Sequence, residues 1–196
     1  MFDRVTIHAS DLEASQRFYE TVLPAVGGAA DDFALAPATP EQPVTRRLHI
    51  AFFAPSRAAV DEFWRAGTDA GYRDDGAPGP RPQYREDYYG GFLLDPDGNS
   101  AEAVHHGEAR AAGRIDHLWI RVADVAAAKR FYETIAPRAG FRLRHASAGR
   151  AQFVGEGGSF SLVSGDEPTE HVHMAFRAGE SEIVVDPDGN TVELVG

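Results

Sequence analysis

Alternation of apolar and polar residues near the start of the chain predicts a strand with Val5 and Ile7 on one face. Asp11 follows, and its residue type is one that caps helix N-termini. The next apolar residues recur at the spacing of one buried helical stripe, at Leu12, Phe18, Tyr19 and Val22. The chain is therefore expected to open with a strand and an amphipathic helix.

The same pattern returns in the second half. Residues 2–27, "FDRVTIHASDLEASQRFYETVLPAVG", align without a gap with residues 115–140, "IDHLWIRVADVAAAKRFYETIAPRAG". "HIAF" at 49–52 then matches "HMAF" at 173–176, and the turn "DPDGN" occurs at 95–99 and at 186–190. A glutamate follows each turn, at Glu102 and Glu193. This order of matches indicates an internal duplication.

Each copy divides again, which gives four βαβββ units in an α+β fold. Units two and three are complete. Unit one is expected to lack about a strand and its turn. Unit four is expected to lack its helix and one strand, because His173 and Glu193 are much closer in sequence than His49 and Glu102 are in the first copy. We therefore predict a first module at residues 1–107, a linker at 108–113 and a second module at 114–196.

Composition narrows the class of protein. The 196 residues are 43% hydrophobic and 25% charged, as in globular proteins that fold unaided. A formal net charge of −11 argues against a nucleic-acid partner and would suit a cationic ligand. No stretch has transmembrane length, and the acidic N-terminal segment does not match a signal peptide. We expect a cytoplasmic monomer or homodimer that binds a small molecule and no membrane.

The repeated motifs resemble those of the vicinal oxygen chelate superfamily, which includes glyoxalase I, extradiol dioxygenases and bleomycin-resistance proteins. The motifs are "DH…D…FYE", "HIAF" and "F…DPDGN…E", and together they cover nearly the whole chain. The resemblance implies two cup-shaped modules of mixed β-sheet, each pairing two units, with helices outside. It implies no single activity, because the superfamily hosts many.

The resemblance also implies metal ligands at three matched positions. Carried over, they are Arg4 or His117, then His49 or His173, then Glu102 or Glu193. A guanidinium cannot ligate a divalent ion, so the set with Arg4 is incomplete. His49, Glu102 and His117 are therefore the leading metal ligands, while His173 and Glu193 rank below them as relics of the duplication. The chain has no cysteine, and the ion would be Fe, Mn, Ni or Zn.

Two pairings of the units are open. If units pair within a copy, one cup holds Arg4, His49 and Glu102, and the complete set of His117, His173 and Glu193 falls in the cup that has lost a helix and a strand. If they pair across copies, unit two meets unit three, and His49, Glu102 and His117 come together between the intact units. We favour the crossed pairing.

Several polar and aromatic residues are candidates for substrate contacts. The segment "RPQYREDYYGGF" at 81–92 lies where relatives line the mouth of the cup, and Trp119 and Arg121 share a strand face with His117. Arg121 could pair with an anionic substrate. The alternative for all of them is a structural role. The candidates are Tyr84, Arg85, Tyr88, Tyr89, Trp119 and Arg121. The remaining histidines are interpreted as core or surface residues: His8, His105, His106, His145 and His171.

The leading functional hypothesis is a metal-dependent lyase, isomerase or dioxygenase acting on a small oxygenated metabolite that chelates the ion through adjacent oxygens. No catalytic residue beyond the metal ligands is assigned. Glyoxalase-type isomerisation is disfavoured because it would need a further carboxylate on a first strand. Extradiol cleavage fits the ligands best, although Phe92 stands where those enzymes carry a tyrosine. The alternative is a drug- or metabolite-sequestering protein of the bleomycin-resistance type.

Overall fold

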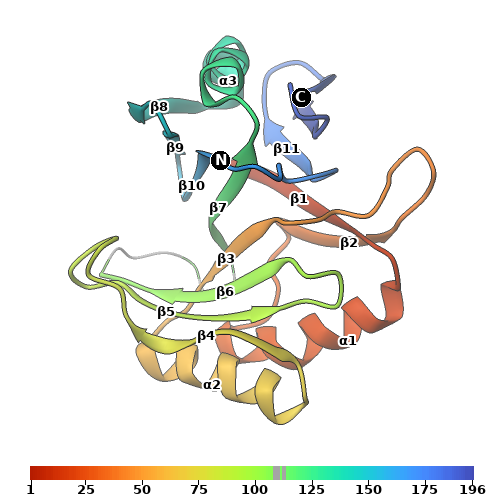
Figure 1. Ribbon diagram of the computed structural model, residues 1–196. Helices are drawn as coiled ribbons and strands as arrows, with labels where there is room; N and C mark the ends of the chain where they lie inside the picture. The colour runs from red at the N-terminus through yellow and green to blue at the C-terminus, as the bar shows by residue number, and fades with distance from the viewer. Residues whose placement is uncertain (108–110, 112–113) are drawn as a thin grey trace.

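The computed structural model describes residues 1–107, 111 and 114–196, so most of the predicted linker at 108–113 lies outside the described residues. The described chain forms three α-helices, a short 3₁₀-helix and thirteen strands, in the order that the duplication predicts (Figure 1). The helices are α1 Leu12–Val22, η1 Leu23–Val26, α2 Arg57–Asp69 and α3 Val125–Ala139. The strands of the first copy are β1 Phe2–Ala9, β2 Phe33–Pro37, β3 His49–Phe53, β4 Arg73–Pro80, β5 Tyr89–Leu94 and β6 Ser100–His105. The strands of the second copy are β7 Ile115–Val122, β8 Phe141–Ser147, β9 Arg150–Gly155, β10 Gly158–Ser164, β11 His173–Arg177, β12 Glu182–Val185 and β13 Thr191–Val195.

The larger sheet has eight strands in the order β4-β5-β6-β3-β7-β10-β9-β8. Its first four strands come from unit two and its last four from unit three. The two units meet at the antiparallel pair β3–β7. The crossed pairing of units is therefore confirmed, and the predicted modules at 1–107 and 114–196 share each sheet between them.

The smaller sheet has five strands in the order β12-β13-β11-β1-β2, drawn from units four and one. Unit four lacks a helix and one strand, as predicted. Unit one was expected to lack about one strand, but it lacks two, because β2 pairs parallel with β1 as β10 pairs parallel with β7. The counterparts of β8 and β9 are both missing from the described residues of this unit.

Helix caps and turns follow the sequence closely. Asp11, Ser56 and Asp124 each cap a helix, with side chains that accept hydrogen bonds from backbone N–H groups of the first turn. Both DPDGN turns have a glycine in the left-handed region, which only glycine adopts without strain: φ is 83° at Gly98 and 90° at Gly189.

Hydrogen bonds between the helices and these turns hold each copy together. The Tyr19 hydroxyl donates to Asp95 at 3.2 Å, and the Tyr132 hydroxyl donates to Asp186 at 2.9 Å. The repeated "FYE" and "DPDGN" motifs are therefore partners in space. The two copies are held internally by these bonds and joined to each other through the sheets.

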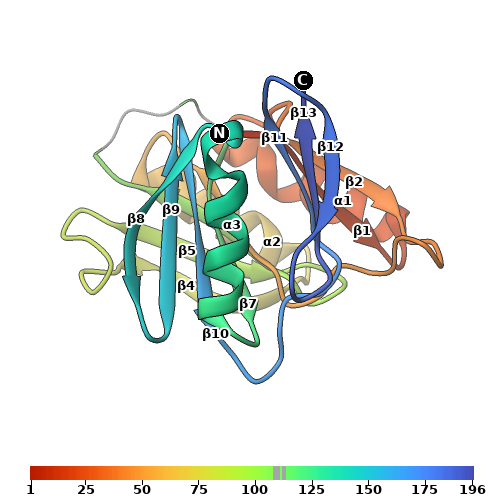
Figure 2. The ribbon, with the colours of Figure 1, turned by 90° about the horizontal axis from the view of Figure 1, so that it is seen from above.

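Apolar packing places the helices against the sheets. Helices α1 and α2 lie side by side along one side of the molecule, and α3 lies between β8–β10 and β11–β13 (Figures 1 and 2). The approach of α2 to the sheet is close: a Cβ on Gly67 would collide with the Leu93 side chain and come within 3.1 Å of Val22. No helix among the described residues is long and apolar enough to span a membrane.

Candidate metal centre

The three predicted metal ligands converge at the centre of the eight-stranded sheet. His49 begins β3, and Glu102 and His117 lie on the strands that flank β3, both in register with Ala51. The Nε2 atom of His49 lies 3.0 Å from Oε2 of Glu102, and Nε2 of His117 lies 3.5 Å from the same oxygen. One ligand atom from each residue falls within 4.8 Å of the others. This is a two-histidine, one-carboxylate set of the kind that binds a divalent ion and leaves coordination positions open.

Glu102 is fully buried and held from behind by a tyrosine. The Tyr88 hydroxyl donates a hydrogen bond of 2.6 Å to Oε1 of Glu102, which leaves Oε2 to face the two histidines. Burial, together with the neighbouring carboxylate, raises the pKa of Tyr88 far above its ordinary value, so the hydroxyl stays protonated and remains a donor. The carboxylate is thereby oriented with one oxygen toward the ligand set.

A β-bulge orients His117. Ile115 lies opposite Phe52 and His117 opposite Ala51, so Asp116 is an extra residue in β7. Its side chain consequently reaches the ring of its own neighbour, and Oδ1 accepts a hydrogen bond from Nδ1 of His117 at 2.9 Å. A carboxylate on Nδ1 fixes the tautomer that leaves Nε2 able to bind a metal.

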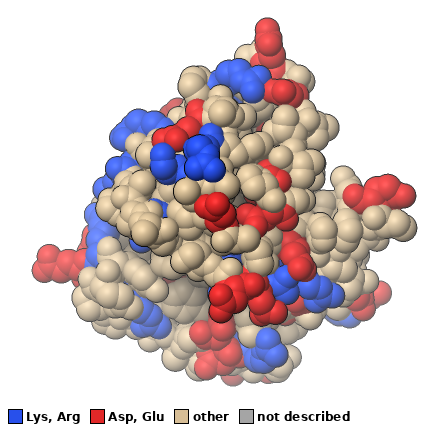
Figure 3. Space-filling model, turned by 45° about the horizontal axis from the view of Figure 1, so that its top comes forward, with Lys and Arg blue, Asp and Glu red and all other residues tan. Residues whose placement is uncertain are grey.

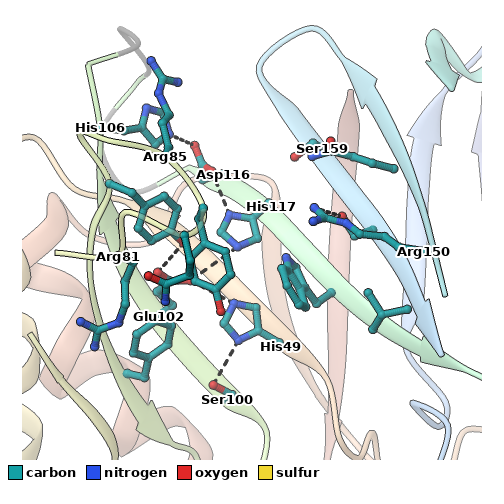
Figure 4. Close-up of a pocket in the computed structure, with 18 of the residues that line it drawn as sticks. His49, Arg81, Arg85, Ser100, Glu102, His106, Asp116, His117, Arg150 and Ser159 are labelled. Atoms are coloured by element: carbon teal, nitrogen blue, oxygen red, sulfur yellow. Dashed lines mark hydrogen bonds and ion pairs between the residues drawn. The ribbon is translucent and has the colours of Figure 1, made fainter. Parts of the chain in front are cut away.

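His106 extends this hydrogen-bonded chain. Its Nε2 lies 2.8 Å from the second carboxylate oxygen of Asp116, and both side chains are buried (Figure 4). The interpretation of His106 as a core or surface histidine therefore missed a residue two steps from the metal ligands. Its contact crosses from the end of β6 to β7, and no local spacing in the sequence points to it.

His49 has a weaker support on the opposite side. Its Nδ1 lies 3.2 Å from the Ser100 hydroxyl, which can accept a hydrogen bond from it (Figure 4). The two histidines are therefore unequal: one rests on a carboxylate and the other on a hydroxyl.

Symmetry defines a fourth position in this cup. His49 and His117 take equivalent places across the antiparallel β3–β7 pair. The register of the outer strands β6 and β10 then makes Ser161 the counterpart of Glu102. A hydroxyl thus stands where a second carboxylate would complete a four-ligand set.

The three ligands lie in a cavity of about 990 Å³. Five of the six predicted substrate contacts also line this cavity, together with the predicted metal ligands. They are Tyr84, Arg85, Tyr88, Trp119 and Arg121. Trp119 lies beside the ligand set, with its ring centroid 6.3 Å from that of His49, and Tyr84 packs on Trp119 at 5.7 Å. The aromatic residues therefore form a wall next to the metal ligands.

Tyr89 is placed elsewhere. Its hydroxyl donates to Asp61 of α2 at 2.7 Å, and the Arg57 guanidinium stacks on its ring. Adjacent strand residues point to opposite faces, so Tyr88 and Tyr89 cannot both enter the cup. The prediction of Tyr89 as a cavity residue conflicts with this placement, and Phe92 lines the cavity instead.

The lower-ranked metal residues lie in the smaller sheet. The Nε2 atom of His173 lies 2.9 Å from Oε2 of Glu193. Among the described residues, no third histidine or carboxylate joins them closely enough to form a metal-binding group. Arg4 is exposed on β1, in the place that His117 takes in β7.

Comparisons with known proteins identify the family and the fold. Residues 1–103 match the family model of the Glyoxalase/Bleomycin resistance protein/Dioxygenase superfamily. The chain belongs to this superfamily. No curated protein matches it.

Solved structures share the fold. Glyoxalase I from Zea mays has a TM-score of 0.67 at 15% identity, with 99% of this chain and 91% of that chain covered. A candidate dioxygenase from Bacillus subtilis has a TM-score of 0.64 at 12% identity, with 98% and 84% covered. At these identities the similarity establishes the tandem fold.

Proposed function

We propose that this protein is a metal-dependent lyase, isomerase or dioxygenase, and that its substrate is a small oxygenated metabolite bound through two adjacent oxygens. The observation that carries the proposal is the convergence of His49, Glu102 and His117 inside a large cavity. Membership of the superfamily supports it, since members bind divalent metals and small-molecule substrates.

The residues present fit a divalent ion. Their ligand atoms are two imidazole nitrogens and one carboxylate oxygen, a mixture that suits Fe, Mn, Ni or Zn. A bound ion would polarise the adjacent oxygens of the substrate and stabilise negative charge that develops on them. Glu102 and the two histidines would hold the ion, while Asp116 and Tyr88 keep these ligands in place.

The ligand set bears on which chemistry is favoured. An isomerisation that uses a second carboxylate as ligand and base has no such group at Ser161, the symmetry-related position. Three ligands on one face leave room for a chelating substrate and one further small molecule, as in non-haem oxygenases. Within the proposal, dioxygenase chemistry is therefore the form that this ligand set supports best.

Metal analysis of purified protein tests the proposal. We expect about one equivalent of a transition metal per chain in wild-type protein and no metal in His117→Ala. His173→Ala is the control, because it removes a histidine from the smaller sheet, and its metal content should equal that of wild-type protein. Protein should be produced separately with added Fe, Mn, Ni and Zn, and each sample dialysed before elemental analysis. Wild-type protein that remains metal-free in all four preparations would contradict the proposal.

The second candidate is a sequestering protein that binds a drug or metabolite without converting it. It is favoured by the size of the cavity and by its aromatic wall of Tyr84, Tyr88 and Trp119. A metal-free protein that still binds a planar ligand in this cavity would favour sequestration over catalysis.

A further inference from the structure

The cavity carries positive charge on both sides, although the whole chain has a formal charge of −11: Arg81 and Arg85 lie on the side of Glu102 and His106, and Arg150 lies across from them (Figure 4). Among the described residues that line the cavity, five are arginines: Arg81, Arg85, Arg121, Arg144 and Arg150. The carboxylates that line it are Asp75, Glu102 and Asp116. On the face drawn in Figure 3, Lys and Arg side chains gather toward the upper left, and Asp and Glu side chains spread over the middle. The cavity is therefore more basic than the protein as a whole, contrary to the expectation of a cationic ligand.

Arg150 lies on the wall opposite the metal ligands, where two contacts hold its guanidinium. Its guanidinium carbon lies 4.9 Å from the centre of the Trp119 ring, and one terminal nitrogen donates to the Ser161 hydroxyl at 3.0 Å. Figure 4 shows the side chain on the strand that faces His49 and His117 across the cavity. Stacking and a hydrogen bond fix the planar group in one orientation, which prepares it to pair with a second planar ion.

The guanidinium retains unused hydrogen-bonding capacity. Its Nε atom is buried and has no hydrogen-bond partner within the described part of the chain, and none of the described carboxylates forms an ion pair with Arg150. Of the lining carboxylates, Glu102 and Asp116 are already engaged by Tyr88 and by histidines. The Arg150 guanidinium therefore has no counter-ion among the described residues, and a ligand carboxylate in the cavity would supply one.

Two further arginines flank Arg150. Arg144 is an extra residue in β8, at a bulge between Leu143 and His145, and it lines the cavity. Arg121 reaches the cavity from β7 and donates to the backbone oxygen of Arg47 at 3.1 Å. Both raise the positive potential of the wall without closing the guanidinium of Arg150 to a ligand.

We propose that this wall binds a carboxylate of the substrate, with Arg150 as its main contact, while the adjacent oxygens at the other end of the molecule meet the metal ligands. This inference rests on the proposed function and narrows the substrate class to small organic acids that carry a carboxylate apart from their chelating oxygens. Trp119 lies between the two ends of the cavity, beside His49 and under Arg150. The middle of such a ligand would pack against its ring.

A pair of matched probes tests this inference. The compound 3,4-dihydroxybenzoate has adjacent hydroxyls and a remote carboxylate, and 4-methylcatechol has the same hydroxyls with a neutral methyl group. We expect calorimetric titration without dioxygen to show that wild-type protein binds the benzoate about ten- to a hundredfold more tightly, as a charge-assisted hydrogen bond allows. We expect Arg150→Gln to bind the two probes within about twofold of each other, with the affinity for 4-methylcatechol little changed.

Arg142→Gln is the matched control, because it removes one positive charge from the same β8–β9 hairpin but lies outside this cavity. It should keep the wild-type preference. A preference that survives Arg150→Gln, or its absence from wild-type protein, would overturn the inference. If Arg150→Gln does not fold, Arg150→Met takes its place, since it keeps an unbranched side chain against Trp119 and removes the guanidinium; a preference that survives in that variant contradicts the inference as well.

The metal content of the same samples separates the two proposals. Protein that contains metal but shows no preference for the benzoate retains the proposed function and loses the carboxylate site. Protein that contains no metal but shows a preference dependent on Arg150 retains the carboxylate site and loses the proposed function.

Discussion

The two sheets contain the same histidine–glutamate pair in different surroundings. His49 and Glu102 lie 3.0 Å apart in the eight-stranded sheet, and His173 and Glu193 lie 2.9 Å apart in the five-stranded sheet. The Glu102 side chain is 1% exposed, whereas that of Glu193 is 34% exposed. The pair alone therefore does not form the three-residue group that could hold a metal ion; the two sheets differ in the third residue and in the cover over the glutamate.

The third position shows the difference most clearly. Both first strands have a bulge at the same place, which makes Asp116 an extra residue in β7 and Asp3 an extra residue in β1. Asp116 supports His117, while Asp3 forms an ion pair of 3.1 Å with Arg177. The bulge and its aspartate are present in both sheets, but Arg4 stands in the smaller sheet where His117 stands in the larger one.

The cover differs because of the truncation. Tyr84 and Tyr88 come from the segment between β4 and β5 of unit two. Unit four passes from β11 to β12 through residues 178–181 and has no counterpart of that segment. A loop that buries the glutamate is thus present in one sheet and missing from the other.

The largest contrast is expected from the two glutamates. Glu102→Gln keeps the shape of the side chain and an acceptor for Tyr88 but removes the anionic ligand, so metal affinity should fall by more than about a hundredfold, beyond the effect of losing a supporting residue. Glu193→Gln should change it by less than about twofold. Competition with a chromophoric chelator measures both. Equal losses of metal affinity in the two variants would show that Glu102 and Glu193 contribute equally to metal binding.

The supporting aspartates should give the next largest contrast. Asp116→Asn weakens the acceptor on Nδ1 of His117, and a loss of such a partner costs roughly 10- to 100-fold in metal affinity. Asp3→Asn is the control in the other sheet and should leave metal affinity unchanged. The same chelator assay applies, and an Asp116→Asn protein with wild-type affinity would remove Asp116 from the metal centre.

Restoring the missing ligand should produce a smaller effect. Arg4→His, combined with Arg177→Ala to release Asp3, would place a third ligand near His173 and Glu193. We expect a second metal equivalent to bind at least about tenfold more weakly than the first, because no loop covers the site. Metal titration followed by calorimetry would show two events. A stoichiometry that stays at one would mean that truncation, and not Arg4, prevents binding.

The smallest contrast concerns the two DPDGN turns, which are equivalent in both copies. Burial raises the pKa of Asp95 and of Asp186 in the folded protein. A raised pKa means that the folded state binds the proton more tightly than the unfolded state does. The resulting contribution to the free energy of unfolding is full below the ordinary aspartate pKa and is lost as the pH rises through the raised pKa. Relative to Asp95→Asn and Asp186→Asn, wild-type protein should therefore gain stability between pH 7 and pH 4. Urea unfolding at both pH values measures this, and a change of opposite sign would contradict the burial argument.

Much of the fold could be predicted from the sequence repeat. The crossed pairing could be predicted because it places the two truncated units, one and four, in the same sheet. The loss of two strands from unit one was underestimated, because a gap in an alignment does not say how many strands it held. The convergence of His49, Glu102 and His117 could be predicted because these residues occupy repeated positions. His106 and Arg150 could not, since neither aligns with a matching residue in the other copy and both depend on contacts across strands.

The β3–β7 joint has a consequence for how the protein is made. While the ribosome is still synthesising the second copy, β3 presents a bare edge to which the corresponding strand of another nascent chain could add. The covalent tandem counters this by keeping the proper strand at high effective concentration. Variants that shorten the connection between residues 107 and 114 until the two copies of one chain cannot meet should therefore shift the protein toward swapped dimers, which would still assemble the central pocket but from two chains.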